Sequence, residues 1–325
     1  MNQLRKDYLT NKWVIIAKER GKRPNDFRYE EKKELIKKCF FCPGNEHRTP
    51  PEIDRIEKDG EWIIRCFPNK FPATTEKKEI TDKGLLKGMA AYGRHEVVVE
   101  TPVHGEELGN LEVEHIAKVL EMYSRREIEL NKDPDIEYVS IFKNKGKTAG
   151  ASFSHSHTQI IALPTVPGVI REEMKVLRKQ GDCPLCQIGD IEKERIIIED
   201  KHTVAFAPYA SRFPFEVRIT PKRHVPSLEG LNKKESHSFA LALKEILTAL
   251  NQSMNQPPYN YHIHLGPKEV DFHMYLELLP RLSILAGFEL SNDVVINTMP
   301  PETAAKHYRE LIKQQIFNLQ IQMIQ

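Results

Sequence analysis

One order of motifs occurs twice in this 325-residue chain, and it limits the possible folds more than any other feature. Each half has a Cys-x-x-Cys pair, a strand-like segment ending at a histidine, a helical segment and a second His-bearing strand. These histidines lie 51 residues apart in the first half, from His104 to His155, and 49 apart in the second, from His224 to His273. Internal repeats usually mean repeated domains, so we expect two tandem domains of similar plan.

The boundary between the two predicted domains falls near the segment TVPGVIREEMKVLRKQGD, where prolines and a charged helical stretch separate the two patterns. We therefore expect domains at residues 1–168 and 169–325, each close to the usual size of ~150 residues. The net charge is +2, from 48 basic and 46 acidic side chains, which gives no basic stripe for nucleic acid. We find no run of ~18 apolar residues and no secretion signal, so we expect a cytoplasmic protein without a membrane partner.

The two Cys-x-x-Cys pairs indicate metal or redox chemistry, because disulfides are rare in cytosolic proteins. Zinc favours four thiolate and imidazole ligands, and such a turn presents two thiolates together. In the first half the predicted ligands are Cys39, Cys42, His104 and His155. Both sites have a full set of four ligands, so we expect two structural zinc ions per chain. The alternative is that each pair is redox-active or simply buried.

The second predicted site contains Cys183, Cys186, His224 and His273, but its fourth ligand is less certain. His262, His264 and Asp271 also lie near it in the sequence. Both halves end a strand in Leu-Pro, and aligning these dipeptides pairs His273 with His157 and Asp271 with His155. We nevertheless favour His273, because imidazole is the softer partner for a thiolate site.

The segment HSHTQ predicts the chemistry of the protein. Side chains two apart on a strand share a face, so His155, His157 and Gln159 point the same way. If His155 binds zinc, His157 is left as a neutral nucleophile toward phosphorus, since its reference pKa is about 6.5. Gln159 cannot titrate, but its amide can donate to a phosphoryl oxygen. The alternatives are that His157 is a further zinc ligand or a satisfied buried histidine, and that Gln159 is an ordinary polar residue.

The loop before this strand, FKNKGKTAGAS, has the composition of a phosphate-binding loop but lacks the P-loop pattern. Together with HSHTQ and the segments CFFCPGNE, CFPNKFPA, HEVVVETPVH and APYASRFPFEVRITPKRH, it closely resembles the galactose-1-phosphate uridylyltransferases of the histidine-triad superfamily. The resemblance covers nearly the whole chain. It implies an α+β fold of two histidine-triad-like domains, each a mostly antiparallel sheet packed with helices.

The resemblance also implies an activity, namely ping-pong transfer of a uridylyl group between UDP-glucose and galactose 1-phosphate. His157 would form the uridylyl-histidine intermediate, and Gln159 would bind its phosphoryl oxygens. The partners are then a sugar nucleotide and a sugar 1-phosphate, and the family suggests a homodimer. By their motifs, the residues expected to contact substrate are Arg20, Arg23, Phe41, Asn69, Asn144, Ser152, Phe288 and Glu289.

Departures from the family pattern leave the substrate open. The familiar motif is H-P-H-G-Q, whereas this chain has Ser156 and Thr158. Lys70 and Ser283 stand where an aspartate for the ribose and a lysine for the sugar phosphate are expected. These features and the second Cys-x-x-Cys resemble the branch containing ADP-glucose phosphorylases, which pass an adenylyl group to phosphate. A zinc-dependent nucleotide-binding protein without turnover is the alternative from another class.

Overall fold

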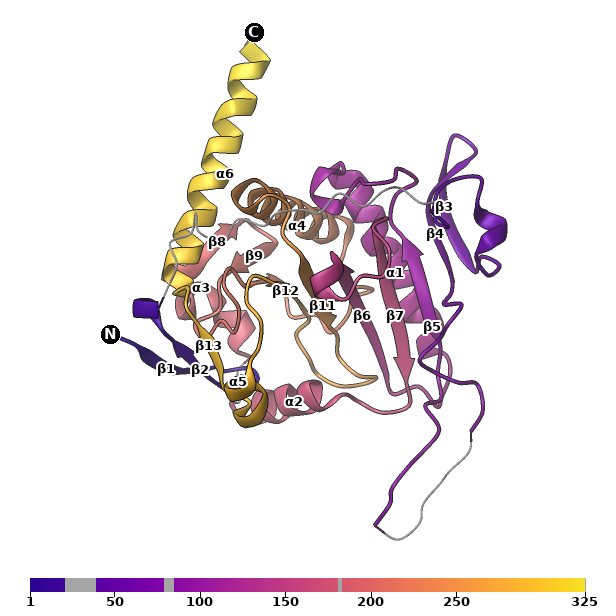
Figure 1. Ribbon diagram of the computed structural model, residues 1–325, viewed down its shortest axis with the longest axis horizontal. Coiled ribbons are helices and arrows are strands. Elements are labelled where there is room, and N and C mark those ends of the chain that lie inside the picture. The colour runs from indigo at the N-terminus through magenta and orange to yellow at the C-terminus, as the bar shows by residue number, and fades with distance from the viewer. Residues whose placement is uncertain (21–38, 79–84, 181–182, 325) are drawn as a thin grey trace.

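The computed structural model describes residues 1–20, 39–78, 85–180 and 183–324. Its main element is a ten-stranded sheet in which every neighbouring pair is antiparallel (Figure 1). In spatial order the strands are β3 (Asp54–Lys58), β4 (Glu61–Pro68), β5 (His95–Val99), β7 (His157–Leu163), β6 (Tyr138–Lys145), β11 (Tyr259–His264), β12 (Tyr275–Pro280), β10 (Val217–Pro221), β9 (Thr203–Phe206) and β8 (Ile196–Glu199). The predicted α+β fold is confirmed.

The repeated plan is visible in the strand order. The order β3-β4-β5-β7-β6 in the first half corresponds to β8-β9-β10-β12-β11 in the second, and the two series meet where β6 pairs with β11. At this seam Ile141 lies opposite Ile263, and Lys143 lies opposite Tyr261. The two halves therefore share one continuous sheet. The domain division at residues 168 and 169 stays a prediction.

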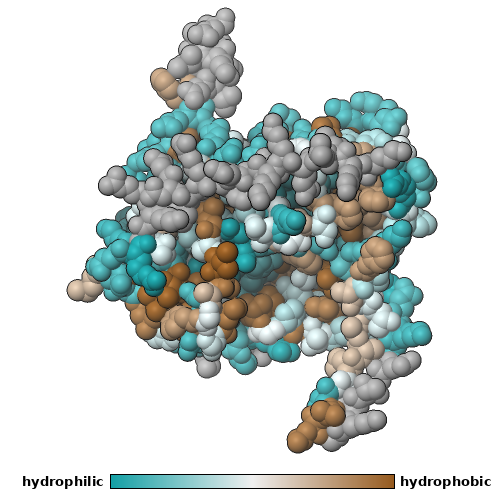
Figure 2. Space-filling view, in the orientation of Figure 1, coloured by the Kyte–Doolittle hydropathy of each residue, from teal (hydrophilic) through white to brown (hydrophobic). Residues whose placement is uncertain are grey.

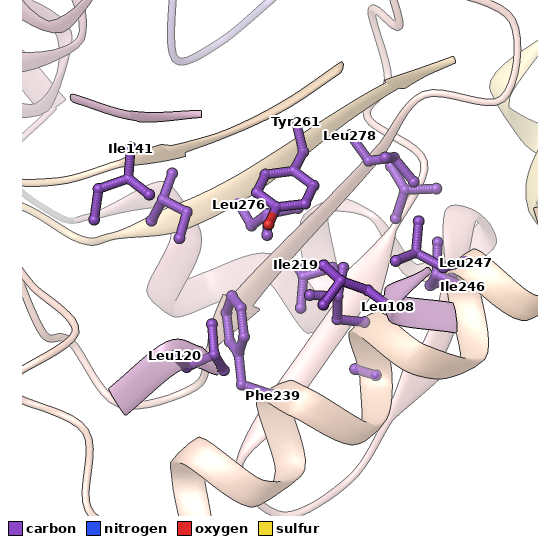
Figure 3. Close-up of a cluster of buried hydrophobic side chains, with 14 of the residues drawn as sticks. Leu108, Leu120, Ile141, Ile219, Phe239, Ile246, Leu247, Tyr261, Leu276 and Leu278 are labelled. Atoms are coloured by element: carbon purple, nitrogen blue, oxygen red, sulfur yellow. The ribbon is translucent and has the colours of Figure 1, made fainter. Parts of the chain in front are cut away.

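Two long helices cover one face of the sheet and build the core. They are α1 (Val113–Asn131) and α4 (Lys233–Met254), and both present long rows of buried apolar side chains. Figure 3 shows Leu120 of α1 and Phe239 of α4 gathered with Leu276 and Tyr261 from the sheet. Burial of such apolar side chains contributes roughly 1.5–3 kcal/mol each to folding. The α4 helix begins at Asn232, whose side chain accepts from the backbone in a capping box.

The remaining elements surround the second half of the sheet. The short helices and the C-terminal helix are α2 (Gly168–Gln180), α3 (Ile188–Ile191), α5 (Gly287–Asn292) and α6 (Pro301–Ile324). A separate three-stranded sheet joins β1 (Gln3–Lys6) and β2 (Trp13–Ile16) to β13 (Val295–Asn297), so the N-terminus packs with C-terminal residues. Figure 1 shows α6 projecting from the body of the molecule. Among the described helices, none combines the length and apolar character that crossing a bilayer requires.

Candidate active site and metal centres

The first Cys-x-x-Cys pair lies against the two histidines predicted for it. Cys39 Sγ is 3.5 Å from His155 Nδ1, and Cys42 Sγ is 3.5 Å from His104 Nδ1. Ligands at the zinc–sulfur and zinc–nitrogen distances of a tetrahedral site are about 3.6 Å apart, so this spacing fits zinc. The Nε2–H of His155 donates to the Thr101 carbonyl at 2.7 Å, which leaves the Nδ1 lone pair directed at the cluster.

One thiol in each cluster has a raised pKa. Burial and the neighbouring Cys39 thiol raise the pKa of Cys42 to about 11, and burial with Cys183 raises that of Cys186 to about 11. Without a metal these groups are thiols, and a bound divalent cation would hold them as thiolates. Each cluster therefore has the donor set of a closed four-ligand site.

The second cluster brings together Cys183, Cys186, His224 and His273. Cys183 Sγ is 3.5 Å from His273 Nδ1, and Cys186 Sγ is 3.3 Å from His224 Nδ1. The Nε2–H of His273 donates to the Pro221 carbonyl at 2.8 Å, as His155 does to Thr101. Burial lowers the pKa of His273 to about 4, so its ring is neutral and available as a ligand.

The alignment of the Leu-Pro dipeptides was wrong by two residues. His273 occupies the place of His155, because each completes the cluster of its own half. Asp271 lies outside the thiolate cluster, with its carboxylate 2.9 Å from Nε2 of His224. His262 and His264 belong to β11 and form a third group with Glu277, away from the cysteines. The two strands therefore differ in length beyond their histidines, which motif spacing alone did not reveal.

His157 begins β7 and is 6% exposed. Its Nδ1–H donates to the backbone carbonyl of His155 at 2.8 Å, and a carbonyl can only accept. The proton is thereby fixed on Nδ1, and Nε2 carries the lone pair. Burial is the main cause of the lowered pKa of His157, so the neutral ring is favoured. This is the tautomer that a nucleophilic histidine needs.

Aromatic side chains surround this imidazole. The Phe41 ring lies 5.4 Å from that of His157 in an edge-to-face arrangement, and Phe153 lies 5.0 Å from Phe41. Phe41 also packs with Phe67 and Trp62 in a small buried cluster. The knuckle that carries the first cysteine pair thus places an apolar wall beside His157. The sequence predicted Phe41 at the site but did not predict Phe67 or Phe153.

Three amide side chains lie on the strands and loops around His157. Gln159 lies two residues further along β7, and its Oε1 is 2.9 Å from Nε2 of His95. Asn69 Oδ1 accepts from the Phe71 N–H at 2.9 Å. Asn144, at the end of β6, accepts through Oδ1 from Asn260 Nδ2 at 2.8 Å. In all three the oxygen has a partner, and the Asn69 Nδ2 also lies 3.2 Å from His95 Nε2.

A buried hydrogen-bond network contacts the strand that carries His157 from the opposite face of the sheet. Ser156 Oγ and Thr158 Oγ1 donate to the two oxygens of Glu100 at 2.6 and 2.7 Å. Lys143 Nζ donates to Glu100 and lies 3.3 Å from the carbonyl of His157. Burial opposes ionisation of Glu100, but Lys143 and these hydrogen bonds lower its pKa to about 2. Ser156 and Thr158, the two residues that differ from the familiar H-P-H-G-Q motif, therefore both donate hydrogen bonds to a buried carboxylate.

The loop between β6 and β7 has the backbone turns that its glycines predict. Gly146 has φ +81°, and a Cβ there would lie 2.9 Å from Cβ of Pro258. Gly150 has φ +89° in the left-handed region, where glycine is favoured. Ser152 is exposed in this loop, just ahead of the HSHTQ strand.

The other predicted substrate contacts are not gathered around His157. Arg20 is exposed at the end of a short 3₁₀ helix, and Arg23 lies outside the described residues. Phe288 and Glu289 lie on α5, which packs beside β13 at the opposite side of the molecule from β7 (Figure 1). In this single chain they are separate from the HSHTQ strand. A motif resemblance can assign residues to the site of a family, but it does not show whether one chain or two chains contribute them.

The corresponding face of the second half is closed by internal contacts. Counted from the ligand His273, Tyr275 and Glu277 take the positions of His157 and Gln159. Tyr275 OH donates to Glu173 at 2.9 Å, and Arg218 pairs with Glu277 at 2.9 Å. Arg218 also pairs with Asp7 from the N-terminal segment, which covers this face. The nucleophilic arrangement therefore occurs in only one half of the described chain.

Comparison with known proteins agrees with this geometry. The model of the galactose-1-phosphate uridyl transferase N-terminal domain matches residues 1–167, and a domain of unknown function (DUF4921) matches residues 107–322. The chain is 35% identical to an ADP-glucose phosphorylase of Arabidopsis thaliana over 95% of this chain and 93% of that protein. It is 32% identical to a galactose-1-phosphate uridylyltransferase of Thermotoga maritima, over 95% of this chain and 98% of that protein.

Solved structures give the same result. The crystal structure of an ADP-glucose phosphorylase from Arabidopsis thaliana with bound ADP-glucose superimposes with a TM-score of 0.84 at 33% identity, over 95% of this chain and 98% of that one. A uridylyltransferase structure superimposes with a TM-score of 0.77 at 30% identity, over 97% of this chain and 99% of that one. The relatives are nucleotidyl-transferring enzymes, and this chain is an enzyme of that kind. It belongs to the galactose-1-phosphate uridylyltransferase family.

Proposed function

We propose that the protein transfers a nucleotidyl group from a sugar nucleotide through a covalent intermediate on His157. The observation that carries this proposal is the 2.8 Å hydrogen bond from His157 Nδ1–H to the His155 carbonyl. It leaves the Nε2 lone pair free to attack phosphorus, and Gln159, two residues along the same strand face, would donate its NH₂ group to the phosphoryl oxygens. Hydrogen-bond donors placed around a phosphoryl group stabilise the charge that develops there.

In the first step, Nε2 attacks the α-phosphorus, forming a nitrogen–phosphorus bond. The phosphorus–oxygen bond to the sugar 1-phosphate breaks, and the leaving oxygen keeps the electron pair. Because this product is already a stable anion, no general acid is needed, and the neutral Gln159 suffices. The imidazole now carries a positive charge, which the His155 carbonyl stabilises through the unchanged Nδ1–H bond. In the second step an acceptor phosphate oxygen attacks phosphorus, and the electron pair returns to Nε2.

UDP-glucose and galactose 1-phosphate are the leading pair of substrates. Support comes from the relatives named galactose-1-phosphate uridylyltransferase, at 25 to 32% identity in four different species. ADP-glucose with phosphate as acceptor is the second candidate. It is supported by the 35% identity to an ADP-glucose phosphorylase and by Ser156 and Thr158 in the nucleophile motif.

We also propose that each cysteine cluster holds a structural zinc ion, because all four ligand positions are filled by protein. His155 then anchors the strand that carries His157. Reduced thiolates are required at both sites, which supports a cytoplasmic location.

A homodimer is proposed on two grounds. Phe288 and Glu289 lie far from His157 in one chain, and Leu85 and Leu86 are exposed apolar side chains. Leu85 and Leu86 are 101% and 74% exposed. Figure 2 shows hydrophobic atoms on a part of the molecule that projects from its body at the lower right. Light scattering over a series of protein concentrations tests the homodimer.

The remaining proposed contacts to the substrate phosphates come from Arg20, Arg23 and Ser152.

The central experiment incubates the full chain separately with UDP-glucose and ADP-glucose and measures the intact mass after acid-free quenching. A uridylyl or adenylyl adduct is expected from one donor, and its matching acceptor, galactose 1-phosphate or phosphate, should discharge it. His157→Gly should abolish the adduct with zinc content unchanged, whereas the control His237→Ala, at an exposed helical position, should retain it. If neither donor labels the wild-type protein, the proposal is wrong.

A further inference from the structure

A second histidine, His95, contacts the catalytic strand from β5. His95 is the first residue of that strand and lies opposite Ile161, so it is the diagonal neighbour of Gln159 on the same face of the sheet. Its Nε2 is 2.9 Å from Gln159 Oε1. His95 is 8% exposed and is not among the residues that the motifs identified.

The backbone fixes which nitrogen of His95 carries the proton. The Ala73 N–H donates to His95 Nδ1 at 3.1 Å, and an N–H group can only donate. Nδ1 must therefore be the unprotonated nitrogen, and the neutral ring has its proton on Nε2. That proton is donated to Gln159, which requires the oxygen of the amide to face His95 and its NH₂ group to face away. Burial lowers the pKa of His95, which favours the neutral ring.

An amide side chain without such a partner can rotate by half a turn. In the rotated form Gln159 would present Oε1 toward the phosphoryl oxygens, where two partial negative charges repel. Asn69 lies on the other side of His95, with its Nδ2 3.2 Å from His95 Nε2 and its oxygen accepting from the Phe71 N–H. With both nitrogens protonated, this contact is not a hydrogen bond, and Gln159 is the acceptor for His95 Nε2–H. Among the described residues, Gln159 Nε2 has no hydrogen-bond partner.

We propose that His95 is a positioning residue for nucleotidyl transfer, which sets the orientation of the Gln159 amide so that its NH₂ group faces the transferred phosphoryl group. The role rests on the proposed function, since it requires Gln159 to contact that group. His95 does not touch the reacting atoms. It acts through the Nε2–H bond to Gln159, and the loop residue Ala73 acts on His95 in turn.

Single-turnover nucleotidylation of His157 tests this role. In His95→Phe, which keeps an aromatic ring without nitrogens, the rate at saturating donor should fall about 10- to 100-fold with little change in KM. His95→Gln places an amide nitrogen near the position of Nε2, and should recover most of the rate. In a Gln159→Ala background, His95→Phe should change the rate less than about twofold, because the two residues act as a unit. Zinc content and melting temperature of each variant show that the fold is retained.

The idea is overturned if His95→Phe reacts within about twofold of the wild type, or if it causes the same fold loss with and without Gln159. Nitrogen NMR of ¹⁵N-histidine-labelled full chain gives a readout that needs no activity. The Nε2–H tautomer of His95, identified by loss of its signal in His95→Gln, is expected, and an Nδ1–H tautomer would contradict the inference. If no donor labels the wild type, the proposed function is refuted. The NMR result tests the orientation of His95 independently of that outcome.

Discussion

Replacing Glu100 by glutamine tests the network beneath the catalytic strand. The substitution keeps the shape of the side chain and removes its charge, so Lys143, which is 1% exposed, loses its nearer anionic partner and keeps only Glu107, at 3.6 Å. The pKa of Glu100 is about 2 rather than its ordinary 4.5. At 1.36 kcal/mol per tenfold change in affinity for the proton, the folded protein gains about 3 kcal/mol from this ionised carboxylate at neutral pH. Measured losses on breaking one partner of a buried pair are similar, at about 3–5 kcal/mol.

The direction of the pH dependence of stability follows from the lowered pKa of Glu100. The stabilisation is fully present above pH 4.5 and is lost as the pH falls toward 2. At pH 7.5, Glu100→Gln should therefore lower the free energy of unfolding by about 3 kcal/mol, measured by urea denaturation of the zinc-loaded protein. Lys143→Met should cost a similar amount, because it leaves Glu100 charged and unpaired.

The double variant separates pairing from simple loss of contacts. Glu100→Gln with Lys143→Met removes both charges of the buried pair and leaves only the more distant Glu107, 3.6 Å from Lys143, without this partner. It should therefore be more stable than either single variant by about 1 kcal/mol or more. Glu114→Gln, at an exposed position of α1, is the control and should change stability by less than about 0.5 kcal/mol. If the two single losses simply add in the double variant, Glu100 and Lys143 do not form the pair described here.

Three further predictions concern other sites. Burial raises the pKa of Glu127 to about 8 from 4.5, so the wild-type protein loses stability as the pH rises from 4.5 to 8 and this carboxyl group ionises. In urea unfolding, the free energy of unfolding of Glu127→Gln relative to the wild type should therefore rise by about 2 kcal/mol between pH 6 and 8. A difference that stays constant with pH would contradict this. Gly146→Ala should raise the KM for the sugar nucleotide in steady-state assays more than Gly60→Ala. Both glycines have positive φ, but only at Gly146 would the added Cβ meet another residue, Pro258. Equal effects of the two substitutions would exclude a role for that contact. His155→Ala and His273→Ala should each remove about one zinc per chain by elemental analysis, with adduct formation lost more severely in His155→Ala; a zinc content of one in the wild type would show that one cluster is not a site.

Much of the site was predictable because its chemistry lies in short segments. Each Cys-x-x-Cys pair and the alternation in HSHTQ reflect local geometry, and the repeated spacing of the histidines pointed to two equivalent clusters. The structure brings the four cysteines and their predicted histidines together in two clusters. Duplication was predictable from the repeated order of motifs. The join between halves was not, since pairing of β6 with β11 depends on packing between segments more than 110 residues apart.

The residues that the sequence analysis missed act at long range. His95 begins a strand whose apolar residues predict a buried element, and nothing in HEVVV shows that Gln159 will lie beside its first residue. Glu100 likewise has no neighbouring cation in the sequence, and its partner Lys143 comes from another strand. The error in aligning the two Leu-Pro dipeptides has a related cause. Strand length beyond a ligand is set by tertiary packing, so the ligand position itself is the better reference.

The seam between β6 and β11 has a consequence for any attempt to express one half alone. Cutting the chain near residue 168 would leave the β6 backbone unpaired over Ile141, Lys143 and Lys145, which now bond to the other half. Such an open edge is a template for adding strands from other molecules. It would also remove Tyr261, whose hydroxyl reaches the Glu100 network from β11. The second half therefore protects an edge of the first half by pairing with it, a structural role that is separate from any contact it makes with substrate.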